Sequence, residues 1–367
     1  MKLSSAFKDY QIPFVFLTLL PILTSSCSSK QKESLGGILS DSTFVNEQLH
    51  IADRIAESQP DSAFTIYRNT IQITNKWLIE YGEQLTPPLW TLRNNALSHR
   101  GLGVINTNSG NYQDALNELD TAQQIIERYQ NNYPSDYKKD IVTLLNSIGV
   151  VQKKSGLYAE ALETYQNAVS IAEEINDDES VAIFYTNTGN IYQEIGDLDK
   201  ANEYIKKAID LHTKNNNTRG VAISSLTLAN ILNTQRKYNE ARPYYIKALE
   251  FCEEQGYSGH VGLIKSNLGV LEKRLGNLSQ AKIYFGSAID NLTKAGNRQG
   301  LALVYGNLAD LAISQSKYSE AIIYATKQLE EAKQSNALVN QRFALKHLSK
   351  AYAALADYKQ AYDNHLL

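Results

Sequence analysis

The sequence predicts an all-α fold in which antiparallel helix pairs stack into a solenoid. The first observation is a small residue inside an apolar helix pattern that recurs every 40 residues, at Gly149, Gly189, Ala229, Gly269, Ala309 and Ser349. The second is an alanine 12 residues after each of them, at Ala161, Ala201, Ala241, Ala281, Ala321 and Ala361. The third is composition, because 7 Pro and 20 Gly leave little room for the tight turns of an all-β fold. A period of this length is typical of repeat arrays.

The N-terminal residues have the order of an export signal. A weakly basic start precedes the short apolar run Ile12–Leu23, and small residues then lead to Cys27. This order resembles a bacterial lipoprotein signal, in which the cysteine is acylated, although Thr24 stands where that family prefers leucine. We therefore expect a signal peptide at 1–26, lipidation of Cys27 and a membrane-anchored lipoprotein of the bacterial cell envelope, facing the periplasm or the cell surface. The same residues also fit a soluble secreted protein or an uncleaved anchor.

The rest of the chain divides into a tether and a repeat array. Residues 27–42 contain too few apolar residues to pack and are expected to form a polar tether. Residues 43–84 are expected to form a degenerate N-terminal repeat, and residues 88–367 to form seven tandem repeats. The chain stops at Leu367, partway through the second helix of the last repeat. We expect that repeat to be truncated and uncapped, so that it can support oligomerisation.

Each repeat is predicted to consist of two antiparallel helices, and the repeat that contains Gly189 and Ala201 serves as the example. Its first helix is expected at 178–195 and its second helix at 198–214, with the turn at Gly196-Asp197. The polar run 215–218 then leads to the next repeat.

The phased small residues predict close contact between the two helices of a pair. Glycine inside a helix costs about 1 kcal/mol relative to alanine, so its recurrence needs a compensating gain. Gly189 is therefore expected to face Ala201 and Ala208 on the second helix. Larger residues are expected to fill the space between repeats, among them aromatic residues four positions after the second-helix alanine, at Tyr165, Tyr245 and Phe285.

The phased residues resemble the tetratricopeptide repeat. Its first pair is matched by Ile148-Gly149 and Leu268-Gly269, its tyrosine by Tyr192 and Tyr352, and its last alanine at Ala168, Ala208, Ala248 and Ala288. The family's tryptophan and its helix-ending proline are absent, which fits longer helices and a period above the usual value of about 34 residues. Long-period repeats such as those of kinesin light chain are the closer comparison. The resemblance covers residues 43–367 and implies a right-handed superhelix whose first helices line a concave face.

No arrangement of residues indicates catalysis or a cofactor. The 6 histidines show no metal-ligand spacing. Cys252 is expected to be a buried structural thiol. The net charge of -3 gives no electrostatic reason to expect nucleic acid. We therefore expect a non-enzymatic protein without a cofactor, a metal site or a nucleic-acid partner.

Polar residues at matching positions of the first helices form the candidate binding site. They are Asn187, Asn190, Asn230, Asn233, Asn267, Lys273, Arg274, Asn307, Asp310 and Lys350. The resemblance implies that asparagines at these positions hold a peptide backbone while basic residues meet acidic groups, and we expect the side chains to face water. The simpler interpretation is that asparagine is a tolerated polar residue on a solvated face.

The leading interpretation is an envelope-anchored scaffold that binds a protein or peptide segment in its concave groove. The alternative is the sensor domain of a tetratricopeptide-type signalling protein, either a histidine kinase or a helix-turn-helix regulator, without its output domain. A third class is an accessory protein for outer-membrane assembly or nutrient uptake, and nothing in the sequence favours it over the first.

Overall fold

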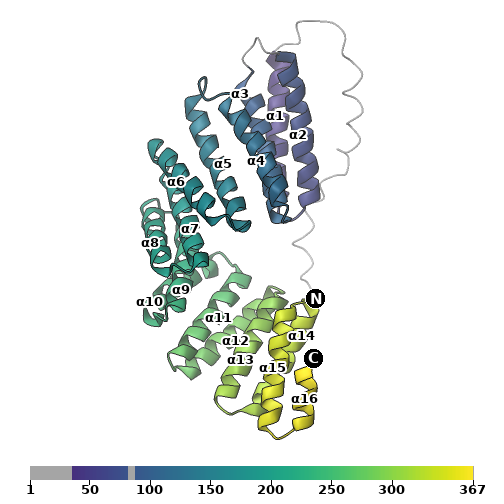
Figure 1. Ribbon diagram of the computed structural model, residues 1–367, viewed down its shortest axis with the longest axis vertical. Coiled ribbons are helices and arrows are strands. Elements are labelled where there is room, and N and C mark those ends of the chain that lie inside the picture. The colour runs from purple at the N-terminus through teal and green to yellow at the C-terminus, as the bar shows by residue number, and fades with distance from the viewer. Residues whose placement is uncertain (1–34, 82–86, 367) are drawn as a thin grey trace.

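The computed structural model describes residues 35–81 and 87–366, in which the chain forms sixteen α-helices and no strand (Figure 1). The helices are α1 Leu35–Ile55, α2 Pro60–Tyr81, α3 Leu89–Asn108, α4 Tyr112–Glu127, α5 Pro134–Lys154, α6 Tyr158–Glu174, α7 Asp178–Ile195, α8 Leu198–Lys214, α9 Thr218–Thr234, α10 Tyr238–Glu254, α11 Ser258–Arg274, α12 Leu278–Lys294, α13 Arg298–Ser314, α14 Tyr318–Gln334, α15 Leu338–Ala354 and α16 Tyr358–Leu366. The predicted signal peptide at 1–26 and the lipidation site Cys27 lie outside the described residues.

The helices form one curved array that runs from α1 at one end to α16 at the other (Figure 1). Each helix packs against the next, and extensive contacts beyond the nearest neighbour join only alternate helices. This arrangement confirms the predicted right-handed α-solenoid of antiparallel helix pairs.

The ends of α7 and α8 are those that the sequence predicts. The Asp177 carboxylate accepts a hydrogen bond from the Ser180 backbone N–H at 3.0 Å, which caps the start of α7. Asp197 caps α8 in the same way through the Lys200 backbone N–H at 3.1 Å. Between the two helices Gly196 has a φ of 93°, a left-handed conformation that glycine adopts without steric cost.

A left-handed residue ends each helix of the regular array. From Gly156 to Ala356 such residues recur every 20 positions, and in that interval they are Asn176, Gly196, Asn216, Arg236, Gly256, Gly276, Gly296, Ser316 and Asn336. At the end of α5 the Gly156 N–H donates to the Lys153 carbonyl at 3.1 Å, and the Leu157 N–H donates to the Gln152 carbonyl at 2.8 Å. These two bonds define a Schellman motif, which satisfies carbonyl groups that the helix leaves free. The 40-residue period therefore consists of two turns that each contain a left-handed residue, although at Gly196 the N–H donates to the Tyr192 and Gln193 carbonyls, at 3.0 and 3.2 Å.

The phased small residues make room for a large side chain from the partner helix. A Cβ added at Gly149 would overlap the ring of Tyr165, and one at Gly189 would lie 2.6 Å from Ile205 Cδ1 and 3.2 Å from the Ala201 carbonyl oxygen. The predicted approach of Gly189 to Ala201 is therefore confirmed. Tyr165 enters the space inside its own pair as well as the space between pairs, where its ring centroid lies 5.9 Å from that of Phe184.

The N-terminal part differs from the prediction at the expected tether. α1 begins at Leu35, so the second half of the expected tether at 27–42 is helical. Farther along the same helix, Val45, Leu49 and Ala52 are spaced along one face and are buried, and this apolar pattern outweighs the polar composition around it. Farther along the chain, α5 begins at Pro134, because proline suits the first turn of a helix.

Candidate functional site

The odd-numbered helices form the inner, concave face of the array. The pairs α1 and α3, α3 and α5, α5 and α7, α7 and α9, α11 and α13, and α13 and α15 contact each other across consecutive repeats. Among the described residues, no contacts of comparable extent join consecutive even-numbered helices. Elements on the shorter side of a curved stack approach each other more closely. The predicted site residues, which are all on odd-numbered helices, are therefore on its concave side.

Three of the predicted asparagines bridge consecutive odd-numbered helices. Each donates an Nδ2–H to an oxygen on the preceding odd-numbered helix: Asn187 to Asn146 Oδ1 at 3.0 Å, Asn267 to Asn230 Oδ1 at 3.4 Å and Asn307 to Ser266 Oγ at 3.5 Å. These three side chains are half-buried, so the expectation that they simply face water is wrong. A primary amide has two donors and one carbonyl acceptor, so each bridge leaves a donor and the acceptor for another partner.

The other predicted asparagines have different surroundings. Asn230 Oδ1 accepts a second hydrogen bond, from the Tyr245 hydroxyl of α10 at 2.7 Å. The side-chain oxygen of Asn233 is buried and has no hydrogen-bond partner. Asn190 is half-buried on α7. Asn230 is therefore engaged within its own repeat, whereas Asn233 keeps an unsatisfied acceptor.

The predicted charged residues divide into paired and free groups. Lys273 on α11 forms an ion pair and hydrogen bond with Asp310 on α13. Burial opposes ionisation of Asp310, but the hydrogen bond and charge of Lys273 outweigh it and lower the pKa of this carboxyl. Arg274 and Lys350 are exposed, and neither forms an ion pair within the described part of the chain. Among the predicted cationic residues, Arg274 and Lys350 therefore have no ion-pair partner in the described part of the chain, whereas Lys273 has one.

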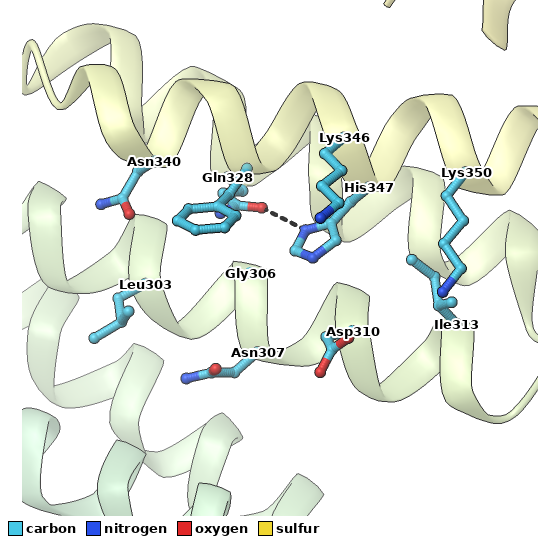
Figure 2. A pocket seen from close by; sticks show the side chains of 11 residues that line it. Leu303, Gly306, Asn307, Asp310, Ile313, Gln328, Asn340, Lys346, His347 and Lys350 are labelled. Atoms are coloured by element: carbon cyan, nitrogen blue, oxygen red, sulfur yellow. Dashed lines mark hydrogen bonds between the residues drawn. The ribbon is translucent and has the colours of Figure 1, made fainter. Parts of the chain in front are cut away.

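A pocket of about 450 Å³ opens between α13 and α15. Figure 2 shows Leu303, Asn307 and Asp310 along α13, with residues of α15 across from them. Its full lining is Leu303, Gly306, Asn307, Asp310, Ile313, Gln328, Asn340, Phe343, Lys346, His347 and Lys350. The pocket thus combines three of the predicted residues with apolar and cationic groups that the sequence analysis did not assign.

His347 is the titratable group at the centre of this pocket. Its Nδ1 lies 3.0 Å from the side-chain oxygen of the buried Gln328 (Figure 2). Burial lowers the pKa of His347, the nearby Asp310 carboxylate raises it, and neighbouring lysines lower it further. The lowered pKa favours the neutral imidazole, whose Nδ1–H donates to the Gln328 oxygen and whose Nε2 is then a hydrogen-bond acceptor.

An apolar row on the odd-numbered helices was missed by the sequence analysis. It consists of Ile183, Ile223, Leu263, Leu303 and Phe343, with exposed fractions of 39%, 50%, 36%, 44% and 44%. Each residue stands six positions before the phased small residue, so the row has the same 40-residue spacing. That spacing was the signal that could have identified it. We refer to these five residues as the apolar row.

Two further findings concern metal ligands and membrane-spanning helices among the described residues. They contain no group of three or more His, Cys, Asp or Glu side chains that could hold a metal ion. None of their helices combines the length and the apolar character that crossing a bilayer requires. Cys252 is buried, as predicted, and burial raises the pKa of its thiol.

Comparison with known proteins places the chain among repeat proteins. A family model described as the MalT-like TPR region matches residues 89–261. No curated protein matches the sequence significantly.

Three solved structures illustrate the similarity of fold. The apo form of RapI aligns with a TM-score of 0.54 and 16% identity, over 80% of this chain and 99% of RapI. The Rap conjugation gene regulator of the plasmid pLS20, in complex with the Phr* peptide, aligns with a TM-score of 0.53 and 14% identity, over 87% of this chain and 82% of the regulator. Aspartyl phosphate phosphatase F from Bacillus subtilis aligns with a TM-score of 0.51 and 12% identity, over 91% of this chain and 97% of the phosphatase. At these identities the similarity establishes a shared fold.

Proposed function

We propose that this chain, a tetratricopeptide-like repeat protein, is a non-enzymatic scaffold that binds a protein or peptide segment on its concave face. The observation that carries the proposal is the set of asparagine bridges between odd-numbered helices. Asn187, Asn267 and Asn307 are held in place by the bridges, and each keeps an unused donor and acceptor. Groups fixed in this way can bond to a peptide backbone with little further loss of side-chain entropy. The structural relative solved with the Phr* peptide supports the same type of ligand.

The first test compares binding by groove and outer-face variants of the full chain. Peptides selected from a random display library would be measured against the wild type and against the double variant Asn267→Ala, Asn307→Ala. Each lost hydrogen bond contributes roughly 0.5–1.5 kcal/mol, so we expect about 5- to 150-fold weaker binding. The control is Asn239→Ala, an exposed asparagine on α10, which should bind as the wild type does.

The bridges require a check on folding. Because the two asparagines also join helices, thermal unfolding of the double variant must be followed beside its binding. Equal binding by the wild type and a folded double variant would refute the groove proposal. Binding lost only through unfolding would leave the bridges as structural contacts and likewise count against it.

We also propose that the scaffold is anchored in the cell envelope through Cys27. The support is the order of basic, apolar and small residues before this cysteine. Cys27→Ser should release the protein from the membrane fraction or leave its signal uncleaved. An unchanged mature mass and membrane partition in the variant would refute the anchor, and a matched Ser28→Ala variant should behave as the wild type does.

A further inference from the structure

The apolar row and the asparagine bridges run side by side along the concave face. Ile183, Leu263 and Leu303 each stand four residues before one of the bridging asparagines, which is about one helical turn. In the pocket between α13 and α15, Leu303 and Phe343 of the row share a lining with Asn307. Figure 2 shows Leu303 and Asn307 one after the other along α13. The two sets of residues are therefore presented to the same opening.

Exposure of one leucine would need no explanation, because single apolar residues are common on protein surfaces. The apolar row is different because five consecutive odd-numbered helices carry such a residue at the same position. On the outer face of the described helices, exposed large apolar residues recur 40 positions apart only at Ile283 and Ile323, which are 64% and 57% exposed. A repeated apolar surface of this kind marks an interaction site.

The charges beside the apolar row are unevenly balanced. Glu194 forms an ion pair with Lys153 at 3.8 Å and Asp310 pairs with Lys273, whereas the exposed Glu179 on α7 accepts a hydrogen bond from the Asn217 side chain at 3.2 Å. On the odd-numbered helices from α9 to α15, five cations form no ion pair within the described residues, namely Arg219, Arg274, Arg342, Lys346 and Lys350. The concave face from α9 to α15 therefore favours a ligand with negative charge.

We propose that the ligand is an extended acidic segment with an apolar residue at every third position, an inference that rests on the proposed scaffold function. Packed helices lie about 8–10 Å apart. A polyproline II chain is extended, advances about 3.1 Å per residue and has three residues per turn, so every third side chain points in the same direction. These side chains repeat about every 9 Å, which is about the distance between consecutive odd-numbered helices. A segment of about thirteen residues would reach all five members of the apolar row.

The asparagine bridges favour an extended ligand over a helical one. An α-helix satisfies its own backbone N–H and C=O groups, so it leaves nothing for the free amide groups of Asn267 and Asn307 to bond. An extended backbone exposes both kinds of group to the groove. The apolar row then selects side chains, the amides bind the backbone, and the free cations favour acidic residues between the apolar ones.

The test uses defined peptides and fluorescence anisotropy with the full chain. The probe is a fluorescein-labelled peptide of about thirteen residues that repeats the unit Leu-Asp-Ser. A second peptide has the same composition, with its leucines moved to the spacing of one helix face. A third repeats Leu-Asn-Ser and therefore lacks the negative charge. We expect the first peptide to bind about tenfold or more tightly than the second, and to lose more affinity than the third when salt is added.

The protein variants separate the apolar row from the rest of the surface. Leu263→Ser and Leu303→Ser should each weaken binding of the first peptide about three- to tenfold. Ile283→Ser and Ile323→Ser on the outer face should leave it unchanged. Equal affinity for the first two peptides, tighter binding of the second, or equal effects of inner and outer variants would each overturn the proposal.

Failure of this inference can be told apart from failure of the scaffold function. If library-selected peptides require Asn267 and Asn307 but not Leu263 or Leu303, the scaffold function stands and the apolar spacing is refuted. If no selected peptide responds to any concave-face variant, both proposals are refuted.

Discussion

The junction of α3 with α5 and the regular array from α5 onward hold their helices together in different ways. At the junction, the buried Asp140 carboxylate accepts hydrogen bonds from Arg93 at 2.9 Å and from the Tyr129 hydroxyl at 2.8 Å. In the regular array, the Tyr165 ring is buried against Gly149 and its hydroxyl has no hydrogen-bond partner. Where the repeat period is constant, the helices can be held together by side chains of matching shape. Where the connection between α4 and α5 is longer, the helices are joined by a directional network of polar side chains.

The largest expected effect comes from removing the acceptor of the polar network. Asp140→Ala should lower the free energy of unfolding by about 2–4 kcal/mol, because the buried Tyr129 hydroxyl and the Arg93 guanidinium lose their partner. The side chain of Arg93 is 38% exposed, so water offsets part of the loss. Urea denaturation measures the change, with the exposed Asp210→Ala on α8 as control. A loss no greater than that of the control would show that the network does not stabilise the junction.

Overpacking tests the shape-based contacts of the regular array. Ala201 and Ala241 are fully buried, so Ala→Leu at either position should lower the free energy of unfolding by about 1–3 kcal/mol. Ala201→Ser changes the volume little and should be nearly silent. Equal tolerance of serine and leucine in thermal unfolding would contradict the packing described.

One chemical change made in both regions compares them directly. Tyr129→Phe removes a hydroxyl that donates to Asp140 and should lower the free energy of unfolding by about 1–2 kcal/mol. Tyr165→Phe removes an unpartnered hydroxyl and should be neutral or slightly stabilising. Denaturation midpoints of the two variants give the comparison, and a reversed order would contradict it.

Alkaline pH should reveal the burial of the same Tyr165 ring. Burial raises the pKa of Tyr165 well above its usual value near 10. A raised pKa in the folded state means that stability is complete below pH 10 and falls as pH rises above it, because only the unfolded state then releases the proton. At about pH 11 this residue should account for roughly 1 kcal/mol of lost stability. Tyr165→Phe should therefore show a shallower fall than the wild type, and an identical fall would refute the assignment.

The smallest effect concerns the turns that both regions share. Arg236 has a φ of 60° at a position where Gly156, Gly196 and Gly276 occur in neighbouring repeats. Arg236→Gly should raise the free energy of unfolding by about 0.5–1 kcal/mol, because a left-handed conformation is unfavourable for a residue with a Cβ. Gly196→Ala is the reverse change and should lower it by a similar amount. Thermal midpoints that move in the same direction for both variants would contradict this reasoning.

The sequence predicted the fold well where chemistry is local. The ends of α7 and α8 could be placed because Asp177, Gly196 and Asp197 are cap and turn residues, whose preferences depend on the adjacent backbone. The start of α1 at Leu35 was missed because a polar composition concealed a weak apolar periodicity.

For the candidate site, the sequence predicted which helices carry the residues but not which residues contact each other. The spacing identified Asn267 and Lys273 as residues of the first helices, but their partners Asn230 and Asp310 lie 37 residues away. Such pairs depend on how far one helix is shifted along the next, and no short pattern records that shift. The apolar row was missed for another reason: an apolar residue in a helix reads as a core residue, and the row differs from the core only by a 40-residue spacing of its own, six positions before the phased small residues.

The left-handed turns also determine which insertions and deletions in the gene leave a chain that can fold. Because a turn with a left-handed residue recurs every 20 residues, removing or duplicating any 40-residue block joins one turn to an equivalent turn. The block need not begin at a repeat boundary, because removal of any 40 consecutive residues of the regular array keeps the remaining turns 20 residues apart. Losing a 20-residue block would instead join two helices of the same direction and bring an inner face to the outside. Unequal recombination between repeats therefore preserves folding only in steps of whole pairs, and each step lengthens or shortens the concave face by one helix.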